Sequence, residues 1–192
     1  ATGGVRRRRY ASLMDGNANG LRDRIVGEKV LYEGRAYDFL ELTLRQPDGT
    51  ERGRPIVRHR GAVVVVPVIE QPGRGPKLLF VRNDRHTIND RLLELPAGGI
   101  ESGETPEEAA ARERGEETGY SASSLYGLGE FYTTPGITDE LMHAYVAVGL
   151  TKLSGGPSLE SDESLTVETH SAGEALEWVE SGKLRDGKSM LA

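Results

Sequence analysis

The sequence predicts an α/β protein in which an antiparallel β-sheet precedes a mixed α/β domain. Residues 62–69 form a continuous β-branched run, which is typical of a buried strand. Residues 106–118 carry helix start and stop signals. Residues 36–44 alternate in hydrophobicity and precede a Pro-Asp-Gly turn at 46–49, so residues 54–58 can return as a hairpin partner. We therefore expect an N-terminal sheet region at 23–60 and a main domain at 61–192.

The remaining elements follow from local patterns in chain order. Residues 77–81 predict a strand that ends before Arg82, and we expect 82–85 to lie in a loop. Further strands are expected at 125–133, 141–150 and 165–168. Ser171 and Glu174 form a second capping box, which opens an amphipathic helix that stops at Gly182.

Composition narrows the function classes. The chain has 192 residues, is 36% hydrophobic and has a formal charge of −6, which argues against a nucleic-acid partner. It has no cysteine, so disulfides and thiolate metal sites are excluded. The longest apolar run, 62–69, is too short to span a bilayer, and no signal-peptide pattern is present. We expect a cytoplasmic protein without a membrane partner.

The first 22 residues are polar and rich in Gly, with four consecutive arginines at 6–9. A flexible tail is expected here, and a basic interaction arm is the alternative.

The helix predicted at 106–118 has a well-defined start and end. Thr105 can cap it, Pro106 suits the first helical position, and Glu108 completes a capping box. Gly119 is a suitable C-terminal stop.

Three carboxylates share one face of this helix, because Glu113, Glu116 and Glu117 stand at i, i+3 and i+4. A solvated acidic surface is one interpretation. The other is a site for Mg²⁺, which prefers carboxylate oxygens and retains waters and substrate phosphates. Arg112 can hold a carboxylate rotamer in place. The Gly-rich loop at 98–103 allows the backbone to approach a ligand closely.

These residues together resemble the Nudix box. The matching positions are Gly98, Glu104, Arg112-Glu113, Glu116-Glu117 and Gly119-Tyr120. The resemblance implies an α/β/α sandwich with a mixed sheet. One position departs, because the family usually has an aliphatic residue where this chain has Arg114. We expect either a snorkelling side chain or a small shift of the helix.

The resemblance also implies hydrolysis of a nucleoside diphosphate linked to another group, assisted by Mg²⁺, with Mn²⁺ as an alternative. The implied metal ligands are Glu113, Glu117 and the Ala97 carbonyl, with Glu116 close by. Arg112 would orient a glutamate, and Glu104 would organise the loop.

Outside the box, residues 135–140 resemble the Pro-Gly-x-x-Asp-Glu loop of the ADP-ribose pyrophosphatase branch. An ordinary β-turn is the alternative. The resemblance assigns Pro135 and Glu140 to substrate binding. Arg82 and Arg85 resemble the basic position after the preceding strand, where a cation can meet phosphate, and Arg85 is the preferred choice. Plain surface arginines are the alternative.

The general base is expected on the late acidic loop, where the candidates are Glu160, Asp162 and Glu163. Alignment of residues 162–165 with the family pattern favours Glu163. Ser161 stands where one relative has an acid, which leaves Glu160 as a second candidate.

The resulting hypothesis is a Mg²⁺-dependent enzyme that cleaves ADP-ribose to AMP and ribose 5-phosphate, with Glu116 and Arg112 also in the catalytic set. Alternatives are a pyrophosphatase for another nucleotide sugar, such as GDP-mannose, and a non-catalytic nucleotide sensor. In the branch that the sequence resembles, the N-terminal sheet builds a subunit interface, so we expect a homodimer.

Overall fold

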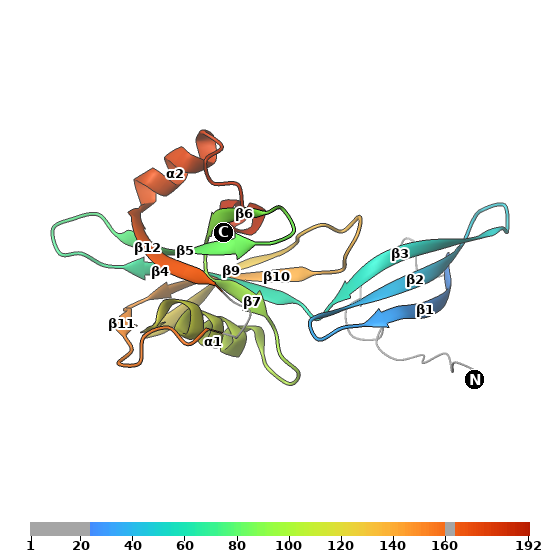
Figure 1. The fold of residues 1–192 in the computed structure, drawn as a ribbon, viewed down its shortest axis with the longest axis horizontal. Coiled ribbons are helices and arrows are strands. Elements are labelled where there is room, and N and C mark those ends of the chain that lie inside the picture. Colours follow the sequence, from blue (N-terminus) through green and yellow to red (C-terminus); the bar gives the residue numbers. More distant parts are fainter. Residues whose placement is uncertain (1–23, 160–163) are drawn as a thin grey trace. The chain divides into compact units, whose positions relative to one another are not determined.

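The computed structural model describes residues 24–159 and 164–192, which form two compact units (Figure 1). The described part of the N-terminal unit comprises residues 24–59 together with 134–139. The main unit comprises 60–133 and the described residues from 140 onward. The expected tail at 1–22 and the candidate bases Glu160 and Glu163 lie outside the described residues.

The N-terminal unit is a three-stranded sheet in the order β1-β2-β3, and it is antiparallel as predicted. Its strands are β1 (Ile25–Glu33), β2 (Tyr37–Arg45) and β3 (Glu51–His59). The predicted turn between β2 and β3 places Gly49 at φ 83°, a left-handed conformation that glycine adopts without strain. The loop 134–139 belongs to this unit, because Val57 pairs with Thr138 and the His59 amide donates to Asp139 Oδ1 at 2.7 Å.

The main unit is built on a mixed sheet in the order β12-β5-β4-β10-β9, with β6 paired to β5 and β7 paired to β4. β4 and β10 run parallel, and the other pairs are antiparallel. The strands are β4 (Ala62–Ile69), β5 (Lys77–Arg85), β6 (Asp90–Glu94), β7 (Ala97–Gly99), β9 (Ser124–Tyr132), β10 (Leu141–Val148) and β12 (Leu165–Ser171). Two short strands, β8 (Tyr120–Ser121) and β11 (Thr151–Lys152), pair separately.

Strand β4 separates two hydrophobic cores, because its side chains point alternately to opposite faces. Val63 and Val65 pack with Ala109 of α1 (Pro106–Thr118). Val64 packs in the cluster that includes Ala175 of α2 (Ala172–Glu180). Helices therefore cover both faces of the sheet (Figure 1), which confirms the predicted sandwich.

The helix boundaries follow the predicted capping signals. Thr105 and Glu108 form the capping box of α1, and Gly119 ends it at φ 72°. Ser171 and Glu174 form the corresponding box of α2. A short helix, α3 (Gly187–Leu191), was not predicted. No helix within the described ranges is both long and apolar enough to span a bilayer.

The placement of Arg82 and Arg85 in a loop was wrong. β5 extends to Arg85, because residues 81–85 pair with β6 across the sheet. The sequence analysis placed the segment in a loop because the apolar pattern of the strand ends at Val81. The structure pairs both arginines with carboxylates on neighbouring strands, so that extended backbone accommodates the charge.

Candidate active site

Arg112 on α1 joins the Gly-rich loop, the strand β7 and the helix. Its Nη1 donates to Glu113 Oε1 at 2.8 Å and to Glu116 Oε2 at 3.1 Å. Its Nε and Nη2 donate to both oxygens of Glu104 at 2.9 Å, and Nη2 also donates to the Gly99 carbonyl at 2.9 Å. Arg112 therefore contacts both glutamates, and its role in orienting them for a metal stays a prediction.

The charges around Arg112 stabilise one another. The bond to Glu104 is the main cause that raises the pKa of Arg112 above its ordinary value, and Glu113 and Glu116 add to it. The same bond lowers the pKa of Glu104. Glu104 also accepts from the Glu101 amide at 3.0 Å, so it fixes the loop from within. The loop carboxylate is therefore ionised and anchored at neutral pH.

Two of the box carboxylates are buried beside the start of β7. Glu113 is 9% exposed and Glu117 is 2% exposed. Glu117 Oε2 accepts from the Ala97 amide at 3.1 Å. Glu113 lies over Gly98, where an added Cβ would stand 2.1 Å from the carboxylate carbon. Glycine is therefore required at position 98 for the carboxylate to lie where it does.

The donor chemistry fits a hard dication. Within residues 24–159 and 164–192 no cluster of three or more His, Cys, Asp or Glu side chains is arranged to hold a metal ion. The two buried carboxylates, Glu113 and Glu117, offer oxygen donors, which is the ligand type that Mg²⁺ prefers, whereas the role of the Ala97 carbonyl as a ligand stays a prediction. Buried carboxylates need compensating charge; Arg112 supplies it to Glu113, and a bound cation would add to it, which is consistent with a metal site.

Arg85 lies against a buried carboxylate. Its Nε and Nη2 donate to Glu94 Oε1 and Oε2 at 2.7 and 2.5 Å. Lys188 Nζ donates to Glu94 as well. The bond to Glu94 is the main cause that raises the pKa of Arg85, and the charge of Glu117 contributes to the shift. The charges of Arg85 and the box carboxylate Glu117 therefore interact.

Arg82 is paired with a different strand. Its Nε and Nη2 donate to Glu168 at 2.5 and 3.1 Å, and His170 Nε2 lies 3.0 Å from Glu168 Oε2. Mainly through the Arg82 bond, the pKa of Glu168 falls to about 2. Arg82 thus joins β5 to β12 through Glu168, whereas Arg85 interacts with the charge of the box carboxylate Glu117.

The two predicted residues of the 135–140 loop fall in different units. Pro135 is exposed in the N-terminal unit. Glu140 belongs to the main unit, where its Oε2 accepts from Thr133 Oγ1 at 2.5 Å. Their roles toward a substrate stay predictions.

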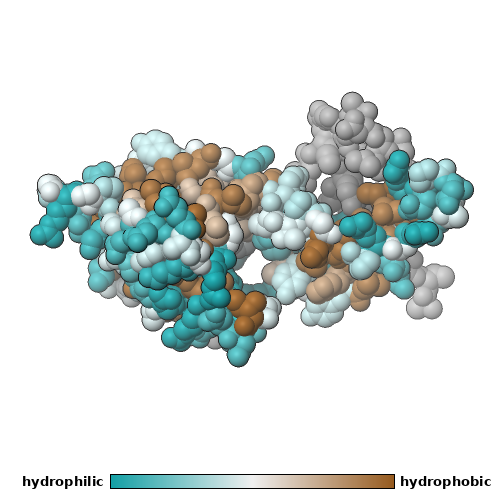
Figure 2. Space-filling model, turned by 90° about the horizontal axis from the view of Figure 1, so that it is seen from above, coloured by the Kyte–Doolittle hydropathy of each residue, from teal (hydrophilic) through white to brown (hydrophobic). Residues whose placement is uncertain are grey.

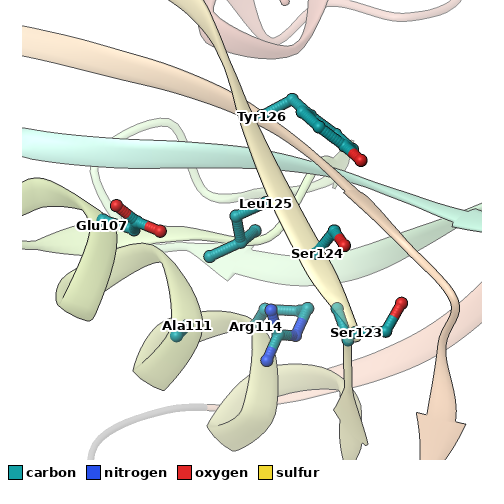
Figure 3. A pocket seen from close by; sticks show the side chains of 8 residues that line it. Glu107, Ala111, Arg114, Ser123, Ser124, Leu125 and Tyr126 are labelled. Atoms are coloured by element: carbon teal, nitrogen blue, oxygen red, sulfur yellow. The ribbon is translucent and has the colours of Figure 1, made fainter.

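Arg114, the residue that departs from the box, is buried instead of snorkelling. It is 5% exposed, its Nε donates to the Tyr120 carbonyl at 3.0 Å, and burial lowers its pKa. No carboxylate partner for it occurs in the described parts of the chain. It lines a pocket of about 410 Å³ between α1 and β9, together with Glu107, Ala111 and residues 122–126 (Figure 3). Glu107, Ala111 and Arg114 share a helix face that differs from that of the box carboxylates.

Comparison with known proteins decides the family. Residues 58–189, more than half of the chain, match the NUDIX domain. The chain belongs to the Nudix family. It is 34% identical over 172 residues to an ADP-ribose pyrophosphatase of Bacillus subtilis, covering 90% of this chain and 91% of that protein. It is 32% identical over 170 residues to a methanol dehydrogenase activator of Bacillus methanolicus, covering 88% and 90%.

This Nudix protein also shares its fold with a crystal structure of an ADP compounds hydrolase. The TM-score is 0.70 at 24% identity, and 88% of each chain is covered.

Sequence reasoning missed the carboxylate that Arg85 contacts and the side chains that support it. Glu94 is a charge within the apolar run 92–95, which is a sign of a functional or paired residue. Asp186 and Ser189 have the spacing of a helix cap, and the structure places Ser189 N at 3.1 Å from Asp186 Oδ2. Nothing in the sequence indicates that Lys188 contacts Glu94, because 94 residues separate them.

Proposed function

We propose that this Nudix protein hydrolyses the diphosphate of ADP-ribose to AMP and ribose 5-phosphate with the aid of Mg²⁺, for which Mn²⁺ is an alternative. The observation that carries the proposal is the pair of buried carboxylates, Glu113 and Glu117, held beside Ala97 with Arg112 on one flank. Similarity to a protein named ADP-ribose pyrophosphatase supports the choice of substrate.

The residues have distinct roles in this proposal. Ala97, Glu113 and Glu117 hold the cation, and Glu116 completes the acidic face. When bound, Mg²⁺ would neutralise diphosphate charge and lower the pKa of a water. Arg112 fixes Glu113 and Glu116 in position through its two Nη1 bonds. All its nitrogens donate to protein oxygens, so it acts on the carboxylates and not on the substrate.

Substrate contacts and proton removal are assigned to other segments. Arg85 provides positive charge for a phosphate, and Glu140 and Pro135 lie in the loop proposed to approach the ribose. Arg82, which is bonded to Glu168, is a weaker candidate for phosphate. Glu163, or alternatively Glu160, is the proposed general base and lies outside the described residues.

The test is product analysis with Mg²⁺ and a panel containing ADP-ribose and GDP-mannose. We expect AMP from ADP-ribose, with a loss of at least about 100-fold in Glu117→Gln, because a missing ligand weakens the metal site. Glu107→Gln is the matched control, since Glu107 is an exposed residue of the same helix on another face. GMP from GDP-mannose alone would contradict the substrate. Binding of ADP-ribose without turnover would favour a sensor.

We also propose that the protein is a homodimer formed through the N-terminal unit. Apolar side chains gather on the visible face of that unit (Figure 2). Leu31 and Tyr32 are 52% and 61% exposed. Phe39 is 44% exposed and packs edge to face with Tyr32, with 6.4 Å between the ring centroids. Exposed apolar patches of this kind mark interaction surfaces. Light scattering should give twice the 20.9 kDa chain mass, and a single-chain mass would contradict the proposal. A cytoplasmic location stays a prediction, which cell fractionation tests.

A further inference from the structure

Helix α3 makes two polar contacts with the strand that leads into the active site. Lys188 Nζ donates to the carboxylate of Glu94, and Ser189 Oγ accepts from the Leu95 amide at 2.7 Å. Both contacts join residues that are 94 positions apart in the sequence. We infer that Lys188 and Ser189 are positioning residues for the diphosphate site: Lys188 acts on Arg85 through Glu94, and Ser189 acts on the Ala97 segment through Leu95. The inference rests on the proposed function.

The first contact fixes the direction of the Arg85 guanidinium. Glu94 is 1% exposed, so its carboxylate must be compensated by cations. It has two, because Arg85 donates through Nε and Nη2 and Lys188 donates through Nζ. With Lys188 removed, Arg85 alone would compensate Glu94, and less of its positive charge would remain for a phosphate.

Lys188 is itself held in place. Its Nζ also donates to Asp186 Oδ2 at 2.9 Å, and Asp186 caps α3 by accepting from Ser189 N at 3.1 Å and from Ser189 Oγ at 2.5 Å. The Lys188 side chain is 12% exposed. Because two carboxylates already restrain the mostly buried Lys188 ammonium, little additional side-chain entropy is lost when it orients Glu94.

The second contact belongs to a series in which four consecutive residues are each restrained. Glu94 is held through its side chain, and Leu95 through its amide to Ser189. The Pro96 carbonyl accepts from the Val65 amide at 2.9 Å. The Ala97 amide donates to Glu117 at 3.1 Å. The Ala97 carbonyl, a proposed metal ligand, therefore lies two residues after Leu95, the second of the two residues that α3 contacts.

A purely structural role for α3 makes different predictions. Leu184 and Ala192, on either side of α3, pack in the α2-side core, so the segment that contains α3 also covers apolar surface. If covering were its whole role, loss of the polar contacts would lower stability while KM and Mg²⁺ dependence stayed unchanged in the folded protein. A positioning role changes those constants, with an effect of Lys188 that depends on Arg85.

The first experiment compares Lys188→Met with Lys188→Arg and with the control Lys183→Met. Lys183 lies just before α3, and its Nζ stands over the Trp178 ring, 4.1 Å from the ring centroid, whereas it is Lys188 that pairs with Glu94. We expect KM for ADP-ribose to rise about tenfold in Lys188→Met, with a smaller change in kcat, as when a ground-state contact is weakened. Lys188→Arg should recover most of the loss, and Lys183→Met should match the wild type.

A double-mutant cycle tests whether Lys188 acts through Arg85. In an Arg85→Ala, Glu94→Gln background, which leaves no unpaired carboxylate at this position, Lys188→Met should change KM by less than about twofold, because the shared target is gone. Equal effects in both backgrounds would overturn the inference for Lys188. Should Lys188→Met fail to fold, Lys188→Gln, which keeps a donor without charge, takes its place.

The second experiment uses Ser189→Ala, which removes the acceptor of the Leu95 amide. The Mg²⁺ concentration for half-maximal activity should rise about tenfold, and hydrogen exchange at the Leu95 amide should accelerate. An unchanged Mg²⁺ dependence with faster exchange would overturn the role of Ser189.

The outcomes also separate this inference from the proposed function. If the wild type binds ADP-ribose without cleaving it, the hydrolase proposal fails, and the same variants are compared by the calorimetric Kd for ADP-ribose and by the binding constant for Mn²⁺. If the wild type binds neither, both proposals are overturned.

Discussion

Replacing Gly98 with alanine would place a methyl group where the Glu113 carboxylate now lies. A Cβ built on Gly98 stands 2.1 Å from the carboxylate carbon and from one of its oxygens. Ordinary contacts begin at 3.4 Å, so the carboxylate would have to move by about 1.3 Å. The obstacle is the end of a flexible side chain, so the backbone of β7 can stay in place.

The displacement sets the expected size of the effect. Misplacement of a reacting or ligating group by about 1 Å costs on the order of 100-fold in rate, or about 2.7 kcal/mol. Glu113 is also bonded to Arg112, which would follow it or lose that bond. The free energy of unfolding should change by less than about 1 kcal/mol, because Gly98 does not have a positive φ.

The assay is AMP release from ADP-ribose as a function of Mg²⁺ concentration. Gly99→Ala is the matched control, since Gly99 follows in the same strand and a Cβ there would meet no atom within 4 Å. We expect about a 100-fold loss in kcat/KM or in apparent Mg²⁺ affinity for Gly98→Ala and wild-type values for Gly99→Ala. Wild-type Mg²⁺ dependence in Gly98→Ala would refute the role of Glu113 as a ligand.

Three further predictions concern stability, each measured by urea unfolding. Arg82 lowers the pKa of Glu168 from 4.5 to about 2, so the pair contributes about 1–2 kcal/mol to the free energy of unfolding above pH 4.5, and this contribution is lost as the pH falls toward 2. In Glu168→Gln the free energy of unfolding should depend less on pH over this range. Arg114→Leu should raise the free energy of unfolding by about 1–2 kcal/mol, since it replaces a buried charge that forms no ion pair among the described residues, and a decrease would contradict this explanation. Gly119→Ala should lower the free energy of unfolding by more than about 2 kcal/mol, because φ is 72° and a Cβ would stand 2.8 Å from the backbone of a loop. Gly182 is the control: its φ is also 72°, but a Cβ there would meet open space, so Gly182→Ala should cost about 1 kcal/mol.

The elements that could be predicted are those whose signals lie in their own residues or in the residues next to them. The start and end of α1 follow from Thr105, Glu108 and Gly119, which lie within one turn of the helix ends. The buried strand β4 follows from its own β-branched run, and the box face follows from helical spacing. Arg112 and its glutamates are near neighbours in the sequence, so their contacts could be anticipated.

The features that were missed depend on pairing between distant residues. The length of β5 is set by its pairing with β6, and an ion pair with Glu94 compensates the charge of Arg85 within the strand. The contact between Lys188 and Glu94 arises only when α3 folds back on β6. No periodic pattern contains this information, because it depends on the tertiary fold.

The single side chain of Arg112 links three separate segments of the candidate site. The same planar group bonds the loop at Glu104, the strand at Gly99 and the helix at Glu113. A lysine has three donors on one atom and cannot span these directions. A substitution of Arg112 that frees the loop would also release the glutamates of the helix. At this residue, evolution therefore cannot make the loop more mobile without also disturbing the proposed metal ligands.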